Sequence, residues 1–248
     1  VTFAQPFTDH LIALELKKRI GLPWLAHFSD PWADNPFTPF DARTRERNLE
    51  LEKIVAEEAD ALVFTSVETV ELFFKKYPAR LREKASVLPQ CYDRSHFVPT
   101  ESPPSGPITV RYLGNFYGRR SPQPLIAGLT ELYRTDPASI EKVRFELIGP
   151  GDADQVNAMA ASLPTGCVAV RSSVGYQESL ALMTSSDGLL IIDAPADISV
   201  FLPSKLIDYI GADKPIFGIT PKGTAADLIA ELGGSVADPA ETQTISAG

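Results

Sequence analysis

Three segments of the sequence carry residues that can bind an anion, and each follows an expected strand. They are residues 114–120, 172–176 and 193–205. The first holds two glycines, which allow close backbone approach to a ligand, and the pair Arg119 and Arg120, whose guanidinium groups can fork onto phosphate oxygens. Two cations at the start of a helix oppose its dipole, so a bound anion explains them better than a solvated surface pair does.

The third segment is expected to lead from a strand through a loop into a helix. With Ser204 as the N-cap, the free amides of the first turn, the Ser204 hydroxyl and the Lys205 ammonium can meet one phosphate. Asp208 follows one turn later, where a carboxylate can accept hydrogen bonds from a ribose. Any strand–helix crossover can also produce a serine cap without a ligand, and a lysine in a first turn is usually solvated. Both explanations stay open.

Two further aromatic positions can contact a ligand. Tyr176, next to the backbone groups of residues 173–175, can stack on a planar base, although a simple strand–helix turn explains the segment equally well. In the first part of the chain, Asp30 and Trp32 lie just beyond an expected strand and suit a sugar or another polar acceptor. A tryptophan in the core and a turn capped by Asp30 are at least as good an explanation.

Strands and helices alternate along the chain, which predicts parallel sheets with helical crossovers. The expected strands are 1–4, 23–28, 61–64 and 85–88, then 108–113, 143–148, 167–170, 188–192, 215–219 and 235–237. The helix expected over residues 7–20 has its apolar side chains at Leu11, Ile12, Leu14 and Leu16. Since the carboxyl ends of parallel strands share one edge of a sheet, the three candidate segments of the second part should meet there.

The proline-rich stretch around Pro103, Pro104 and Pro107 separates two strand–helix series. We therefore predict a first domain over residues 1–100, a linker over 101–107 and a second domain over 108–248. The predicted fold class is α/β, with two Rossmann-like, doubly wound parallel-sheet domains of which the first is incomplete. The sequence has no initiator methionine, and we expect it to start inside a longer protein.

The composition narrows the class of partner. The net charge of -9 argues against a nucleic-acid partner. With only three histidines and two cysteines, Cys91 and Cys167, neither a transition-metal site nor a disulfide framework is expected. No apolar run approaches the roughly 20 residues of a membrane span. We expect a cytoplasmic protein. The short basic run Lys17-Lys18-Arg19 leaves peripheral contact with the inner face of a membrane undecided.

Four motifs in order resemble a known family. They are ADALVFTS at residues 59–66, VLPQCYD at 87–93, YLG at 112–114 with Arg119-Arg120-Ser121-Pro122 after it, and PSKLIDYI at 203–210 with Lys214-Pro215-Ile216. Together they resemble the retaining GT-B glycosyltransferases of glycosyltransferase family 4, in a variant common among bacterial polysaccharide enzymes. The resemblance covers most of the chain but not the family's N-terminal glycine-rich loop.

The resemblance implies a nucleotide-sugar donor on the second domain and an acceptor on the first. By position, Arg120 matches the family's diphosphate-binding lysine and Asp208 its ribose-binding glutamate, while Ser204 and Lys205 match the loop–helix junction beside the phosphates. Two positions depart from the family. Asn115 stands where the family has a diphosphate-binding arginine, and Val200 stands where it has the first of two acids, a role for which Asp197 is one candidate.

We therefore expect a retaining, metal-independent hexosyltransferase without a cofactor. Its donor would be a nucleotide diphosphate sugar of the UDP or GDP type, and its acceptor a glycan, a lipid-linked sugar or a small molecule. The expected catalytic residues are Arg120, Lys205 and Asp30. The expected donor-binding residues are Gly114, Asn115, Arg119, Arg120, Tyr176, Ser204, Lys205 and Asp208.

The departures at Asn115 and Val200 favour an alternative, a GT-B module that binds a nucleotide or a sugar and has lost catalysis. A sugar-nucleotide epimerase of the same fold ranks last, because no convincing acid–base pair is present in the sequence.

Overall fold

The computed structural model describes residues 1–98, 106–241 and 245, and its contacts divide the chain into two compact units. Unit 1 comprises Val1–Gln90 with Val200–Leu202, and unit 2 comprises Cys91–Ser199 with Pro203–Gly248. Each unit is a parallel-sheet α/β structure, which confirms the predicted fold class. Most of the expected linker 101–107 lies outside the described residues, so the domain limits 1–100 and 108–248 stay a prediction.

Unit 1 has a four-stranded parallel sheet in the order β1-β2-β3-β4. Its strands are β1 (Thr2–Ala4), β2 (Leu25–Phe28), β3 (Ala61–Phe64) and β4 (Ala85–Val87). Its helices are α1 (Thr8–Ile20), α2 (Ala42–Glu58), α3 (Val67–Phe74) and α4 (Ala79–Arg82). Side chains of all four helices pack in one cluster with β2 and β3, so the helices share one face of the sheet.

The core of unit 1 follows from the period-two alternation of its strands. Ala26 and Phe28 of β2 are fully buried, as are Leu62 and Phe64 of β3, and all four pack in one cluster with side chains of α1 to α4. The intervening residues point to the opposite face of the sheet, where Phe3 of β1 is 61% exposed.

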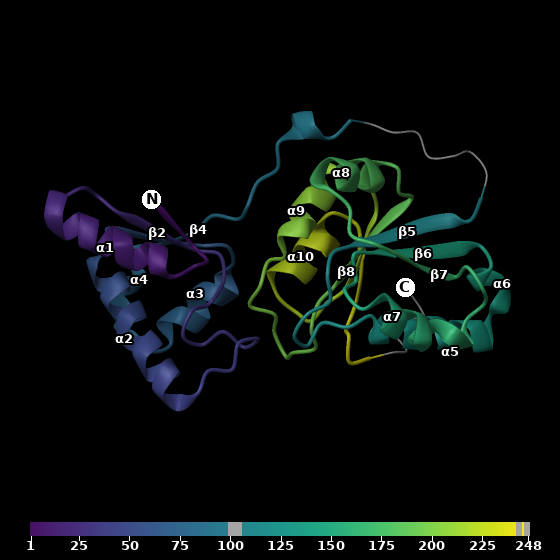
Figure 1. Cartoon of the computed structure of the whole chain (residues 1–248), viewed down its shortest axis with the longest axis horizontal. Helices are drawn as coiled ribbons and strands as arrows, with labels where there is room; N and C mark the ends of the chain where they lie inside the picture. Colours follow the sequence, from purple (N-terminus) through teal and green to yellow (C-terminus); the bar gives the residue numbers. More distant parts are fainter. Residues whose placement is uncertain (99–105, 242–244, 246–248) are drawn as a thin grey trace. The chain divides into compact units, whose positions relative to one another are not determined.

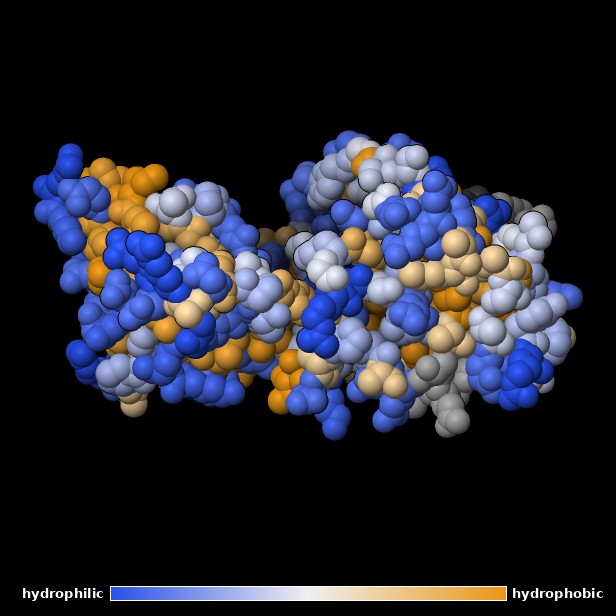
Figure 2. Space-filling view, turned by 60° about the horizontal axis from the view of Figure 1, so that its bottom comes forward, coloured by the Kyte–Doolittle hydropathy of each residue, from blue (hydrophilic) through white to orange (hydrophobic). Residues whose placement is uncertain are grey.

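The outer side of α1 is apolar, contrary to the sequence expectation of one buried face. Leu14 is buried and Leu11 packs against the core, but Ile12, Leu16 and Ile20 are all more than half exposed. Their four-residue spacing places them on a separate strip of the helix, which lines a hollow with Thr2 and Phe3 of the edge strand β1. Hydrophobic residues are visible at the end of unit 1 that carries α1 in Figure 2.

Val200–Leu202 belongs to unit 1 through contacts with the start of α3. The Val200 carbonyl accepts hydrogen bonds from the Ser66 hydroxyl (2.9 Å) and the Thr69 hydroxyl (2.5 Å). Phe201 stacks on Phe37 with ring centres 4.5 Å apart. Ser66 also caps α3, since its hydroxyl accepts from the Thr69 amide. Val200 thus has a structural role in unit 1.

Unit 2 has a six-stranded parallel sheet. Its strands are β5 (Ile108–Leu113), β6 (Val143–Ile148), β7 (Val168–Arg171), β8 (Gly188–Ile192), β9 (Ile216–Ile219) and β10 (Ser235–Ala237). Its helices are α5 (Gln123–Thr135), α6 (Pro137–Ile140), α7 (Ala153–Met159), α8 (Tyr176–Thr184), α9 (Ser204–Gly211) and α10 (Thr224–Glu231), with short 3-10 turns at Arg94–His96 and Ala160–Ser162.

The strand order in unit 2 is β10-β9-β8-β5-β6-β7, so the chain starts in the middle of the sheet and builds outward in both directions. Helices α5, α6 and α7 cover one face, and α8, α9 and α10 cover the other (Figure 1). The central strand β8 is buried at every position. Leu190 and Ile192 pack towards α5, while Leu189 and Ile191 alternate to the opposite face. Within the described ranges, no helix is both long and apolar enough to cross a bilayer.

Candidate functional site

The strand order of unit 2 reverses between β5 and β8, and the candidate site lies at their carboxyl ends. The loop after Leu113 leads to α5 on one face of the sheet, whereas the loop after Ile192 leads to α9 on the other. Loops that diverge in this way leave a crevice between them, which is where open parallel α/β sheets bind their ligands. Two of the three predicted segments, 114–120 and 193–205, meet here.

Arg120 is held in place by Asp193. Its Nε donates to Asp193 Oδ1 at 2.9 Å, and its Nη1 donates to the Tyr117 hydroxyl at 2.6 Å. The Arg120 side chain is only 8% exposed. Burial disfavours its charge, but the Asp193 carboxylate more than offsets this and raises the Arg120 pKa. The adjacent Arg119 is exposed. The structure therefore separates two arginines that the sequence treated as a pair.

Lys205, from the first turn of α9, approaches the same crevice. Its Nζ donates to the Tyr112 hydroxyl at 2.9 Å and lies 4.1 Å from the centre of the Tyr112 ring. Burial, together with the nearby charge of Arg120, lowers the pKa of Lys205 to about 7, although Asp193 acts in the opposite direction. Among the described residues, two cations from distant parts of the chain thus lie close to the Asp193 carboxylate.

Gly114 allows this close approach. Its φ of 140° is one that side-chain-bearing residues rarely adopt, and a Cβ added there would lie 2.4 Å from Lys205 Nζ. Asn115, next in the chain, is exposed and packs in the same way against a glycine, since a Cβ on Gly151 would lie 2.4 Å from its Oδ1. The glycines after β5 and β6 therefore make room for polar side chains at the sheet edge.

The start of α9 differs from the expectation by one residue. Pro203 is the N-cap, in an extended conformation, and its carbonyl accepts from the Leu206 amide at 2.9 Å. Ser204 is the first helical residue, is exposed and makes no side-chain cap, so its predicted capping role was wrong. Asp208, one turn further, is half-buried, and burial raises its pKa.

Sequence reasoning missed three residues that shape the site: Tyr112, Asp193 and Tyr209. The fully buried Tyr209 of α9 accepts from the Leu113 amide at 2.9 Å and so ties α9 to the end of β5. The one available sequence signal was position, because Tyr112 is the last residue but one of a strand and Asp193 directly follows another strand. Neither position indicated its partner.

Three other candidate residues lie elsewhere. Tyr176 follows β7, the outermost strand of the sheet, and is 53% exposed with its ring against His96. Asp30 belongs to unit 1 and accepts from the Gln5 side chain at 3.4 Å. Trp32 is 4% exposed and stacks on Phe7 with centres 4.6 Å apart, as its alternative explanation as a core residue requires.

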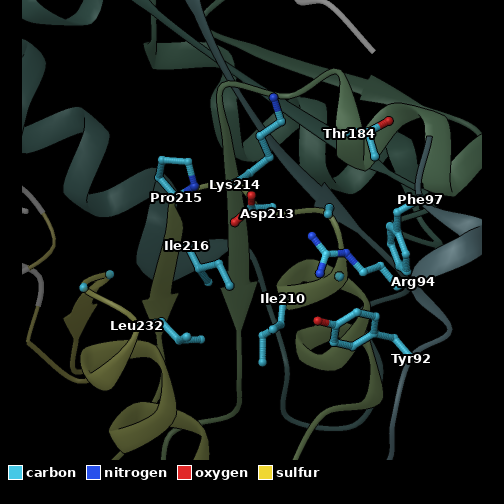
Figure 3. Close-up of a pocket in the computed structure, with 14 residues that line it drawn as sticks. Tyr92, Arg94, Phe97, Thr184, Ile210, Asp213, Lys214, Pro215, Ile216 and Leu232 are labelled. Atoms are coloured by element: carbon cyan, nitrogen blue, oxygen red, sulfur yellow. The ribbon is translucent and has the colours of Figure 1, made fainter. Parts of the chain in front are cut away.

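A second hollow in unit 2, of about 800 Å³, lies at the opposite edge of the sheet (Figure 3). It is lined by Ile210 and its neighbours at the end of α9 and by Pro215 and Ile216 at the amino end of β9. Phe97 packs so closely on Gly211 here that an added Cβ would lie 2.5 Å from its ring. We place the functional site at the crevice instead, because the buried cations gather there. In the part of the chain that the structure describes, no three metal-ligating side chains cluster.

Comparison of this chain with known proteins identifies its fold. No family model matches the chain, and neither does any curated protein sequence. Among solved structures, the Anabaena protein HepE in complex with UDP-glucose aligns with a TM-score of 0.63 at 16% identity, over 99% of this chain and 66% of HepE. The sucrose-phosphate synthase of Thermosynechococcus elongatus aligns with a TM-score of 0.69 at 15% identity, over 96% of this chain and 60% of its own.

The trehalose-6-phosphate synthase OtsA aligns with a TM-score of 0.67 at 13% identity, over 96% of this chain and 61% of OtsA. The fold is that of the GT-B glycosyltransferases. At these identities the likeness extends to the fold alone, and this chain spans just under two thirds of the length of these structures.

Proposed function

We propose that this protein is a glycosyltransferase that moves a sugar from a nucleotide diphosphate sugar to an acceptor. The observation that carries the proposal is the convergence of Arg120, Lys205 and Gly114 with the start of α9 at the reversal of strand order in unit 2. Two cations beside free helical amides make a site for a group with at least two negative charges, such as a diphosphate.

The proposed mechanism is stabilisation of the leaving group. As the bond between sugar and diphosphate breaks, negative charge develops on the diphosphate oxygens. Arg120, Lys205 and the first amides of α9 would offset this charge, and they are already in place before the reaction starts. Interactions that strengthen as the charge develops lower the barrier rather than merely holding the substrate.

Two remaining assignments follow the resemblance: Asp208 would accept hydrogen bonds from the ribose, and Ser204 would line the phosphates. Asn115, which departs from the family, is a further candidate beside the phosphates, and the exposed Arg119 has less support than Arg120. Tyr176 as the base-stacking residue has the least support, because it lies at the outer strand of the sheet. HepE was solved with UDP-glucose, which favours a UDP-type donor over a GDP-type one. Retention, metal independence, a role in bacterial polysaccharide synthesis and an acceptor near Asp30 all stay parts of this proposal.

A specific observation favours the second candidate, a module that binds a nucleotide or sugar without catalysis. The position expected to hold an acid is Val200, whose carbonyl is bound by Ser66 and Thr69. A residue held by its backbone with an apolar side chain can supply neither an acid nor a base. The two candidates share the nucleotide site and differ in turnover.

The test is calorimetric titration of the protein with UDP, GDP, ADP and their sugars. We expect micromolar binding of one diphosphate. Since a hydrogen bond to a charged group contributes about 1.5–3 kcal/mol, Arg120→Ala should weaken it by roughly 10- to 100-fold. Arg119→Ala, which removes the same charge from the exposed neighbour, is the matched control and should have a much smaller effect.

Transfer or hydrolysis of the bound donor would establish the glycosyltransferase, and tight binding without either would establish the inactive module. No binding of any nucleotide, or equal effects of the two arginine substitutions, would contradict the site.

A further inference from the structure

We propose that Asp193 is the positioning residue of Arg120, setting the guanidinium in the pose that receives the donor diphosphate. The proposal rests on the proposed function of the crevice. Asp193 directly follows β8, and its carboxylate is fully buried. Oδ1 accepts from Arg120 Nε at 2.9 Å and from the Ala194 amide at 2.8 Å, while Oδ2 accepts from the Ser199 hydroxyl at 2.7 Å.

These contacts make Asp193 a rigid anchor. The Asp193 amide donates to the Ile219 carbonyl, so the residue continues the hydrogen-bond ladder of the sheet. The Ser199 and Ala194 contacts then fix the carboxylate itself. The contact at Nε, close to the aliphatic stem of Arg120, fixes the plane of the guanidinium rather than only its distance. The Arg120 guanidinium in turn packs over the Tyr117 ring, with its Cζ 5.0 Å from the ring centre.

The carboxylate also lets two cations coexist in an empty site. Arg120 and Lys205 repel each other, and the repulsion helps to lower the Lys205 pKa to about 7, whereas Asp193 acts against that shift. Buried charges that lack a counter-charge are costly, and a flexible arginine would otherwise turn towards solvent. Asp193 therefore supplies the counter-charge that keeps Arg120 inside until the diphosphate arrives.

A purely electrostatic role and a positioning role of Asp193 predict opposite changes in diphosphate affinity for Asp193→Asn. If Asp193 acted only as a negative charge near the phosphates, Asp193→Asn would tighten diphosphate binding by removing repulsion. If it holds Arg120 in place, the same change weakens binding despite the more positive site. Asn is nearly isosteric and can still accept the Ala194 amide, so the substitution chiefly removes the charge that Arg120 meets.

The experiment first identifies the nucleotide by titrating the unchanged protein with UDP, GDP and ADP. If none binds, the proposed function fails before Asp193 is tested. With the binding nucleotide, we expect Asp193→Asn to weaken the diphosphate about tenfold, or about 1.4 kcal/mol. The corresponding nucleoside, which lacks phosphates, should bind both proteins equally. A merely structural role would weaken nucleoside and diphosphate together.

Two further variants complete the test. Asp193→Glu keeps the charge and should recover part of the lost affinity. Asp227→Asn, which removes a carboxylate from an exposed position of α10, is the matched charge control and should bind as the unchanged protein does. In an Arg120→Ala background Asp193→Asn should have no further effect, because the residue acts through Arg120. Tighter diphosphate binding by Asp193→Asn, equal loss of nucleoside binding or additive effects would overturn the proposal.

Discussion

The two sheets are built by the same alternation of strands and helices, yet they gather different chemistry at their edges. In unit 1 the strands follow one another in sequence order, whereas in unit 2 the order reverses between β5 and β8. Without a reversal, successive loops of unit 1 turn towards the same face and pack on the helices there. At the reversal in unit 2, two loops part and leave Arg120 and Lys205 beside each other.

Both units bury ionisable groups, but the arrangement of the buried charges differs between them. In unit 1 the fully buried Glu52 accepts from the Tyr77 hydroxyl at 2.7 Å and the Ala33 amide at 2.9 Å, and it pairs with Lys76 at 2.8 Å. This network ties α2 to the loop that holds Ala33 and to the segment between α3 and α4, and it leaves the carboxylate satisfied by the protein. Among the described residues of unit 2, Arg120 and Lys205 both lie near the Asp193 carboxylate. The proximity of two cations, rather than burial itself, distinguishes the candidate site.

Acid should destabilise unit 1 through His10, with the largest effect expected among these tests. Its Nδ1 lies 2.8 Å from the Thr2 hydroxyl, while its buried Nε2 finds no hydrogen-bond partner among the described residues. Burial, together with the charge of His27, lowers the His10 pKa from 6.5 to about 4. The unfolded chain therefore takes up a proton first, and stability should fall by up to about 3 kcal/mol as the pH drops from 6.5 towards 4.

Tryptophan fluorescence during urea unfolding measures this effect in unit 1, because Trp24 and Trp32 are the only tryptophans of the sequence. The His10→Gln variant should show a flatter dependence on pH between 6.5 and 4.5, whatever its absolute stability. The same slope in both proteins would show that His10 is not the titrating group and would remove this contrast between the units.

Gly114→Ala tests the difference between the two units at the candidate site of unit 2. The added methyl would meet Lys205 Nζ at 2.4 Å and would force a φ of 140° on a residue that disfavours it. We expect a loss of about 2 kcal/mol in stability and about tenfold weaker binding of the nucleoside diphosphate. Gly175→Ala, at a φ of -69° with nothing within 4 Å, is the matched control and should change neither quantity. If Gly114→Ala bound the diphosphate with unaltered affinity, the observed position of Lys205 would not be required for binding.

The affinity for the diphosphate should itself depend on pH through Lys205. Burial and the charge of Arg120 lower its pKa to about 7, so above pH 7 a proton must be taken up before the ammonium can meet the phosphates. Affinity should therefore fall as the pH rises from 7 to 9, by at most about tenfold per pH unit. Calorimetry in buffers of different ionisation enthalpy should detect the proton uptake, and Lys205→Arg should abolish it. Constant affinity over this range would indicate that Lys205 is charged throughout.

Local sequence patterns were sufficient for the strands of unit 2 that lie in the core. The strands 108–113, 143–148 and 188–192 were predicted with the bounds that the structure has, because a run of apolar residues is itself the cause of a buried strand. The helix ends were less certain. The N-cap of α9 is Pro203 and not the predicted Ser204, since a proline in an extended conformation can serve as the cap.

The hydrophobic pattern of the sequence did not predict which side chains contact one another. Ile12 and Leu16 were predicted to join Leu11 and Leu14 in one buried face of α1, yet they are exposed. Periodicity shows which residues share a helix face but not how wide a strip the neighbouring sheet covers. The pair Arg119 and Arg120 posed the same problem, because only the turn before α5 decides which guanidinium points inward.

The sequence by itself determined that this chain forms parallel α/β units with phosphate-binding residue types at strand ends, since those features depend on neighbours within one or two turns. The tertiary structure decided the order of the strands and, through it, the pairing of Arg120 with Asp193, 73 residues away, and of Lys205 with Tyr112, 93 residues away. Such contacts depend on which strands lie side by side, which no local pattern of residues specifies.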